Sequence, residues 1–403
     1  MLTVKLALRN LLRQKRRTLF TGLSMFIGFV LAGFLIGWAD GTYNHIIDKF
    51  TRNRLGHIQI HQKDYLDKPT LYKTIEDPEE IGGRLDQIGE IEAWTMRIYS
   101  AGLVSVTQKS AGADIIGIDL KREEKTTAFS QKVIKGRYPE ESGEVLIGYE
   151  LANILHGGPG DQIAVFSQAA DGSIAENLYT IAGLVDMGDP VLNRSGFYMS
   201  LKDAQELFVL YNQAHEIAVN LYDLRKTEAV TADIQRILTD TTLSVSPWQE
   251  FAEEFYRAMQ ADKNGMYISL VVVILVVAIT ILNTTLMSVM ERQREYGVLK
   301  AIGTRPGGIV TMVIAETSML AFLSIIVGAL VTFGLNLYMA EYGLHLKEPI
   351  NWGGMQLVYM KSEINFRSFI LPAVTVMATS LCVCLFPALK APRTEPAKTM
   401  RIM

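Results

Sequence analysis

Histidine and cysteine are the side chains that most often bind metals or attack substrates, and this chain of 403 residues uses them sparingly. His57 and His61 share one face of a predicted strand, but strand geometry separates them by about 13 Å, too far to chelate one ion. The sequence contains no H-E-x-x-H, paired C-x-x-C or G-x-x-x-x-G-K-[ST] pattern. Cys382 and Cys384 lie in an apolar segment, where they are expected to act as small apolar filler. We therefore expect no catalytic residue, metal or cofactor in this chain.

The most informative charged residues lie between two apolar segments, from Glu291 to Arg305. A charged turn is followed by a small apolar face, and Gly303 is placed to end a short helix as its C′ glycine. Such a surface helix suits docking into a groove on another protein; a solvated turn is the alternative. The residues predicted to make this contact are Glu291, Arg292, Arg294, Glu295, Gly297, Val298, Leu299, Lys300, Ile302 and Gly303.

The chain contains four apolar segments, two before these residues and two after them. Each is long enough to cross a bilayer, which takes about 20 helical residues. They are residues 19–39, 266–290, 309–340 and 369–389. A soluble helix seldom runs this far without a polar face. A cleaved signal peptide is the rival interpretation of the first segment. The apolar part of a signal peptide is usually about 7–15 residues long, and residues 19–39 are longer, which favours a retained anchor.

Charge predicts the orientation of these spans. The chain is 49% hydrophobic and 20% charged with a net charge of −3, which excludes disorder and gives no basic excess for nucleic acid. Residues 1–18, 291–308 and 390–403 together hold 14 basic and 3 acidic residues, whereas residues 40–265 hold 22 basic and 35 acidic. We therefore expect the three basic segments, including both termini, to be cytoplasmic, and residues 40–265 and 341–368 to lie outside.

The outer segment 40–265 shows short alternating strand and helix patterns. Strands are predicted at 57–60, 92–106, 113–118, 216–221 and 243–246, and helices at 78–88 and 227–238. This order indicates an α+β domain in which a βαβ-type unit is interrupted by a mainly β insertion at about residues 121–211, rich in glycine turns. The predicted fold class is an α+β membrane protein with four transmembrane helices and this large domain between the first two.

Apolar residues at helical spacing join the outer domain to the first two spans. Continuous helical stalks and separate amphipathic connecting helices are equally compatible with this pattern. The predicted stalk residues are Tyr43, Ile47, Phe50, Phe251, Phe255 and Met259.

Small residues at four-residue spacing in the first span permit close helix approach and predict a dimer seam. The seam residues are Ser24, Gly28, Ala32, Gly33 and Gly37. Glu316 is the one ionisable residue inside a span; because it lies near the start of the third span, we expect it to snorkel to the cytoplasmic surface.

The run Glu291–Ile309 (ERQREYGVLKAIGTRPGGI) resembles the cytoplasmic coupling motif of the MacB, LolC/LolE and FtsX group of ABC transporter permeases. Similar matches occur at Arg9-Asn10-Leu11 and at Gly136-Arg-Tyr-Pro followed by residues 143–148. The Pro-Ala-containing tail 391–401 and the order of spans also resemble this group, and lipoprotein-releasing members without a fused ATPase are the most similar in layout.

This resemblance implies partners and a mechanism. Such permeases act in the bacterial inner membrane as dimers, with an identical or a paralogous second copy, and each binds one subunit of a cytoplasmic ABC ATPase dimer that holds ATP and Mg. MacB itself carries a fused ATPase, whereas this sequence lacks a nucleotide-binding loop, so a separate ATPase chain is expected.

Three functions follow as alternatives from the resemblance. The first is extraction or release of lipoproteins from the membrane, with lipids and a periplasmic carrier or adaptor as further partners. The second is MacB-like export of an amphiphilic small molecule or peptide, and the third is FtsX-like activation of a periplasmic enzyme. The missing catalytic motifs disfavour a membrane-anchored enzyme.

Overall fold

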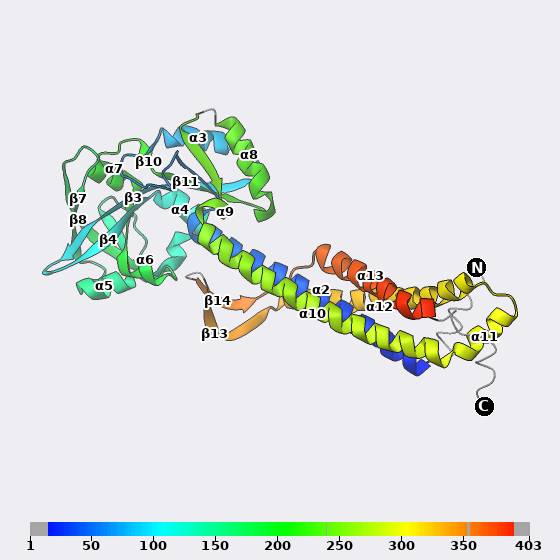
Figure 1. The fold of residues 1–403 in the computed structure, drawn as a ribbon. Coiled ribbons are helices and arrows are strands. Elements are labelled where there is room, and N and C mark those ends of the chain that lie inside the picture. The colour runs from blue at the N-terminus through cyan, green and yellow to red at the C-terminus, as the bar shows by residue number, and fades with distance from the viewer. Residues whose placement is uncertain (1–14, 239, 353–354, 391–403) are drawn as a thin grey trace. The chain divides into compact units, whose positions relative to one another are not determined.

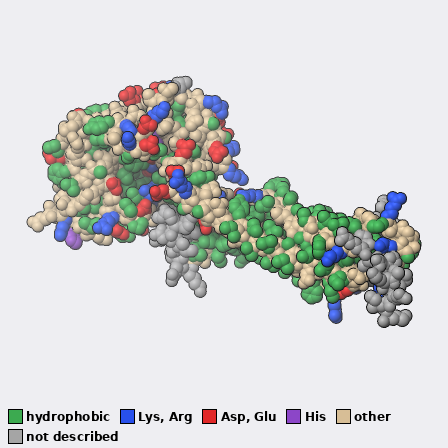
Figure 2. Space-filling model, in the orientation of Figure 1, with side chains coloured by type: hydrophobic (Ala, Val, Ile, Leu, Met, Phe, Trp, Pro, Cys, Tyr) green, Lys and Arg blue, Asp and Glu red, His purple; other side chains and the backbone are tan. Residues whose placement is uncertain are grey.

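The computed structural model describes residues 15–238, 240–352 and 355–390. Its contacts divide the chain into two compact units. One, here called the helical domain, contains described residues up to His45, Ala258–Leu346 and those from Tyr359 onward; the other, the sheet domain, contains Ile46–Arg257 and Lys347–Val358. Figure 2 shows apolar side chains along the helical domain, and charged side chains on the sheet domain and at the α11 (Gln293–Ala301) end of the helices.

Four helices carry the predicted spans, and all four are long and apolar enough to cross a membrane. They are α2 (Lys15–Phe50), α10 (Glu253–Glu291), α12 (Pro306–Glu341) and α13 (Arg367–Lys390). The four-helix prediction is therefore confirmed (Figure 1). A short helix, α11 (Gln293–Ala301), connects α10 to α12.

The first two of these helices continue beyond their apolar segments. α2 runs unbroken to Phe50 and α10 begins at Glu253, so the chain has continuous helical stalks. Phe251 lies in a separate short helix, α9 (Trp248–Phe251), because the chain leaves helical geometry at Ala252. The apolar repeat predicted from Phe251 to Met259 is thus interrupted, and the Trp248 ring packs edge-on against Phe255 across the interruption.

The sheet domain is built on one ten-stranded sheet with the order β12-β1-β11-β3-β4-β9-β6-β8-β5, in which β7 pairs with β3 and β8. Its strands are β1 (Ile58–Gln62), β3 (Ile91–Val106), β4 (Lys109–Ile118), β5 (Val133–Gly136), β6 (Glu144–Gly148), β7 (Gln162–Gln168), β8 (Ile174–Val185), β9 (Gly196–Ser200), β11 (Glu216–Leu221) and β12 (Leu243–Pro247). Two short strands, β2 (Ile75–Glu76) and β10 (Gln213–Ala214), pair separately.

Short helices cover this sheet. They are α3 (Pro78–Leu85), α4 (Leu120–Thr127), α5 (Tyr149–Leu155), α6 (Pro190–Ser195), α7 (Leu201–Phe208) and α8 (Thr227–Ile237), with the 3-10 turns η2 (Phe129–Lys132) and η3 (Leu224–Lys226) and a π turn η1 (Thr51–Leu55). Capping side chains begin several of them: Asp119 accepts hydrogen bonds from the Lys121 and Arg122 amides at α4, and Ser200 accepts one from the Asp203 amide at α7.

The glycine-rich insertion does not form a sheet of its own. Its strands β5 to β9 extend the main sheet through the parallel pairing of β4 with β9, where Ile116 lies opposite Tyr198. The two larger cores of this domain lie on either part of the sheet: one packs α3 and α8 against β1, β11 and the first half of β3, and the other packs α5 and α7 against the inserted strands. The mixed α+β fold class is as predicted, with a single continuous sheet linking both parts.

The segment 341–368 was expected to be a loop, but it contains a hairpin of β13 (Leu344–Trp352) and β14 (Met355–Met360). Its sequence gave no clear signal, because Pro349 and two charged residues interrupt the apolar alternation. The predicted cytoplasmic residues 1–14 and 391–403 lie outside the described part of the chain.

Candidate coupling site between α10 and α12

The connection from α10 to α12 is a short helix held by backbone geometry at both ends. Arg292 leaves helical geometry after α10, and α11 begins at the next residue. At the other end Gly303 has φ +98°, and the amides of Gly303 and Thr304 donate to the carbonyls of Lys300 and Leu299. This is the Schellman arrangement, so the predicted C′ role of Gly303 is confirmed. Pro306 then occupies the first turn of α12, where no amide donor is needed.

One face of α11 is open. Val298 is 52% exposed and Ile302 is 77% exposed, and they lie one helical turn apart. Glu291 and Arg294 extend the same exposed face toward α10. The result is a small surface with an apolar centre and charged neighbours, which is suited to a groove on another protein.

The opposite face of α11 is anchored in the helical domain. Tyr296 is fully buried and packs in a cluster with Val289, Ile309 and Val313, which belong to α10 and α12. Leu299 packs against the same cluster. Of the predicted apolar face, Leu299 therefore points inward whereas Val298 and Ile302 point outward, because a nine-residue helix turns its 298 and 302 positions away from position 299.

A buried ion pair adds to this anchor. Arg292 Nη1 lies 2.7 Å and 3.0 Å from the two carboxylate oxygens of Glu316, and its Nε donates to Glu295 at 2.9 Å. The Arg292 side chain is 6% exposed and that of Glu316 is 12% exposed. The expectation that Glu316 snorkels is therefore wrong: a buried carboxylate is stabilised by a paired cation, and Arg292 supplies one from the neighbouring segment.

The small residues predicted to form a dimer seam lie mainly against helices of the same chain. Gly28 faces Val277 of α10, Gly33 faces Thr332 of α12, and Gly37 faces Asn336 of α12. Ala32 is 6% exposed, and the Ser24 hydroxyl donates to the Phe20 carbonyl within α2. An intermolecular role for these five residues stays a prediction; what they do in one chain is to let α2 pack closely.

The predicted stalk residues pair α2 with α10 in each domain. In the sheet domain the rings of Phe50 and Phe255 stack with centroids 4.0 Å apart. In the helical domain Tyr43 donates a hydrogen bond to Asp262, and Met259 is 1% exposed. Ile47 is 3% exposed. These helices therefore contact each other along the segment that the apolar repeat marked.

No group of three or more His, Cys, Asp or Glu side chains is placed to hold a metal within the described residues. His57 accepts a hydrogen bond from the Leu221 amide, and His61 lies between Gln59 and the His215 carbonyl. These histidines bond to neighbouring backbone and side-chain groups of the sheet.

Comparison with known proteins identifies this arrangement. Residues 18–237 match the family described as MacB-like periplasmic core domain, and residues 267–396 match the FtsX-like permease C-terminal family. The chain belongs to this family of ABC-type permeases. The sheet domain thus corresponds to its periplasmic core, and the spans with α11 to its permease segment.

Several relatives share most of the chain. LolC of Neisseria meningitidis serogroup B, a lipoprotein-releasing system transmembrane protein, is 22% identical over 320 residues, which covers 75% of this chain and 76% of LolC. LolE of Haemophilus influenzae is 23% identical over 342 residues, 81% of each chain. The macrolide export protein MacB of Chromobacterium violaceum is 21% identical over 181 residues, 42% of this chain and 28% of MacB. The crystal structure of the periplasmic region of MacB from Actinobacillus actinomycetemcomitans aligns with a TM-score of 0.37 at 12% identity, over 49% of this chain and 92% of that one.

Proposed function

We propose that this permease couples ATP hydrolysis by a separate cytoplasmic ATPase to a conformational change of its periplasmic sheet domain, and that the change releases lipoproteins from the inner membrane. The observation that carries the proposal is the construction of α11: one face is exposed, and the other is fixed to α10 and α12 by Tyr296 and by the Arg292–Glu316 pair.

Docking of the ATPase onto the exposed face is supported by its chemistry. Val298 and Ile302 supply apolar anchors, and Glu291 and Arg294 supply charges at the edge, the composition expected of a helix that enters a groove. The basic segment between the second and third spans supports a cytoplasmic position for α11.

Transmission from α11 to the periplasmic side is supported by rigid links. A movement of α11 is passed to α12 through the Arg292–Glu316 pair, because separating two buried opposite charges is costly. α10 runs unbroken from Glu253 to Glu291, where it ends beside α11, and α2 contacts α10 through the Tyr43–Asp262 bond and the Phe50–Phe255 stack. A second permease copy and an ATPase dimer complete the proposed complex.

Release of lipoproteins is favoured over the alternatives by the extent of similarity. LolC and LolE match about three quarters or more of this chain, whereas the MacB match covers less than half of it. A lipidated protein or peptide is therefore the first substrate to test, and export with an adaptor or activation of a periplasmic enzyme are the other outcomes.

The test reconstitutes the full chain with its ATPase in proteoliposomes that contain a triacylated lipoprotein. We expect ATP to move the lipoprotein into the soluble fraction when a periplasmic carrier is present. Ile302→Asp should abolish ATPase binding, because a charge enters the apolar centre of the docking surface. Leu330→Asn, at another exposed apolar position but in α12, is the matched control and should leave ATPase binding unchanged. Intact ATPase binding by Ile302→Asp would refute the docking role, and ATP-dependent hydrolase activation without lipoprotein release would refute the substrate assignment.

A further inference from the structure

The sheet domain contains a partly open cavity of about 400 Å³ that the coupling mechanism does not use. Small-molecule sites in proteins enclose roughly 300–1,000 Å³. This cavity is therefore large enough for one small ligand and lies near the lower end of that range.

The register of the sheet explains why the cavity has a polar and an apolar half. In one row across the sheet, Glu216 of β11 lies opposite Arg97 of β3, which lies opposite Ile118 of β4. In the next row, Ile116 of β4 lies between Tyr99 and Tyr198. Residues two apart on a strand share a face, so both rows point into the same space. The turn η2 and the helices α4 and α6 then provide walls around it.

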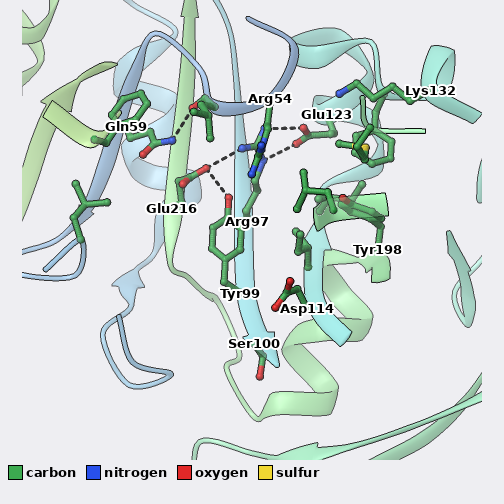
Figure 3. Close-up of a pocket in the computed structure, with 18 residues that line it drawn as sticks. Arg54, Gln59, Arg97, Tyr99, Ser100, Asp114, Glu123, Lys132, Tyr198 and Glu216 are labelled. Atoms are coloured by element: carbon green, nitrogen blue, oxygen red, sulfur yellow. Dashed lines mark hydrogen bonds and ion pairs between the residues drawn. The ribbon is translucent and has the colours of Figure 1, made fainter. Parts of the chain in front are cut away.

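The polar half is a buried ion network (Figure 3). Arg97 donates to Glu123 at 2.7 Å and to Glu216 at 2.9 Å, and these three side chains are at most 5% exposed. Lys132 also lines the cavity, and burial lowers the pKa of its ammonium group from 10.5 to about 8. The two cations balance the two carboxylates, while the nearby Arg54 is paired with Asp189 at 2.7 Å.

One buried hydroxyl group on this wall has no hydrogen-bond partner. Arg97 donates three N–H groups to Glu123 and Glu216. Tyr198 is 2% exposed, and its phenol oxygen has no partner among the described residues. Glu123 is already saturated, because both of its oxygens accept from Arg97 and also from Thr95 or Thr127. A buried donor without an acceptor costs free energy, so the site favours a ligand that brings acceptors.

The other half of the cavity is apolar. Its lining includes Ile116, Phe129, Met187 and Leu192. Because charges on the polar wall cancel and Asp114 adds one further carboxylate, a negatively charged ligand gains little there. An apolar chain with an uncharged carbonyl group satisfies both halves.

We propose that this cavity binds a single acyl chain through its ester or amide carbonyl group, with the chain against Ile116 and Phe129 and the carbonyl oxygen toward Arg97 and Tyr198. Such a group occurs in free monoacyl lipids and in acylated cysteine residues of lipoproteins. The proposal does not depend on ATPase coupling, so binding and transport can fail independently.

The test uses the full chain in lipid nanodiscs and a glycerol monoester whose acyl chain carries a photoactivatable diazirine. We expect adducts on peptides that contain Ile116, Phe129 or Leu192. Leu66→Trp fills the mouth of the cavity at a residue that is 44% exposed and should lower adduct yield about tenfold. Leu178→Trp, at a 60% exposed position outside the lining, is the matched control and should not change it. Tyr198→Phe should weaken binding roughly three- to tenfold, the value of one hydrogen bond.

Competition identifies the ligand. Glycerol mono-oleate and a triacylated cysteine lipopeptide carry the same carbonyl chemistry, and competition by either supports the proposal and names the source. Adducts that are unchanged in Leu66→Trp, or that fall outside the sheet domain, would overturn it. Stronger competition by oleate or by an alkyl trimethylammonium ion would overturn the choice of an uncharged head group.

Discussion

Replacing Glu316 with glutamine removes the charge that neutralises Arg292 while keeping nearly the same side-chain volume. The two groups form a buried pair, with Arg292 Nη1 2.7 Å from the nearer Glu316 oxygen. Removing one partner of a buried pair costs roughly 3–5 kcal/mol, because the other charge stays behind in a poorly solvated place. Glu295 also accepts from Arg292, but it is 41% exposed, so it offsets only about 1 kcal/mol. The expected loss is about 2–4 kcal/mol in the free energy that holds α11 against α12.

Hydrogen exchange measured by mass spectrometry on the full chain in nanodiscs reports this loss directly. Opening of α11 exposes the amides of residues 293–303, and a loss of about 2–4 kcal/mol raises their exchange rate roughly 30- to 900-fold. Glu295→Gln is the matched control: it removes the exposed partner of the same arginine and should raise the rate less than about fivefold. Equal rates in the two variants, or an unchanged rate in Glu316→Gln, would refute the assignment of the Glu316 pair as the anchor.

Three further predictions concern single residues. The pKa of Lys132 is lower in the folded protein than in the unfolded chain, so the folded state binds fewer protons between pH 8 and 10.5. The free energy of unfolding of the wild type should therefore rise by up to about 3 kcal/mol over that range relative to Lys132→Met. Melting temperatures of the two proteins against pH measure this difference. Gly303→Ala places a side chain at φ +98° and should destabilise the C-terminal end of α11 by about 1–2 kcal/mol. Hydrogen exchange there should become faster, and an unchanged exchange rate would contradict the Schellman geometry. Gly33→Val puts a Cβ 2.7 Å from the Ser368 carbonyl and 2.8 Å from Thr332, so it should lower the melting temperature in detergent. Gly334→Val, whose Cβ meets nothing within 4 Å, should leave the melting temperature unchanged. Equal effects of the two substitutions would argue against close packing of α2.

The spans were predictable because their signals are local, whereas the apolar repeats left continuous stalks and separate connecting helices equally open. A segment of about 20 apolar residues fixes a membrane helix by length alone. The strand predicted at 216–221 has those bounds, and the helix predicted at 78–88 begins at Pro78 and ends at Leu85. Gly303 was placed correctly because a helix end needs a residue that tolerates positive φ.

The hairpin at β13 and β14 and the interruption at Ala252 were not predicted, because both depend on contacts beyond the local pattern. Periodicity identified an apolar face on α11 but not its division into exposed Val298 and half-buried Leu299, since neighbouring helices decide which part is covered. The glycines of α2 illustrate the same limit: their spacing indicates close packing but not whether the partner helix is in the same chain or another.

The sequence by itself determined that this protein has four membrane helices, an acidic α+β domain between the first two and a basic connection between the second and third. Only the tertiary structure decided that Glu316 pairs with Arg292, and that Arg97 meets Glu216, 119 positions away, beside a cavity. The physical reason is that hydropathy, helical period and backbone conformation are properties of neighbouring residues. Charge pairing and cavity walls instead depend on which helices pack together and on the register across β11, β3 and β4.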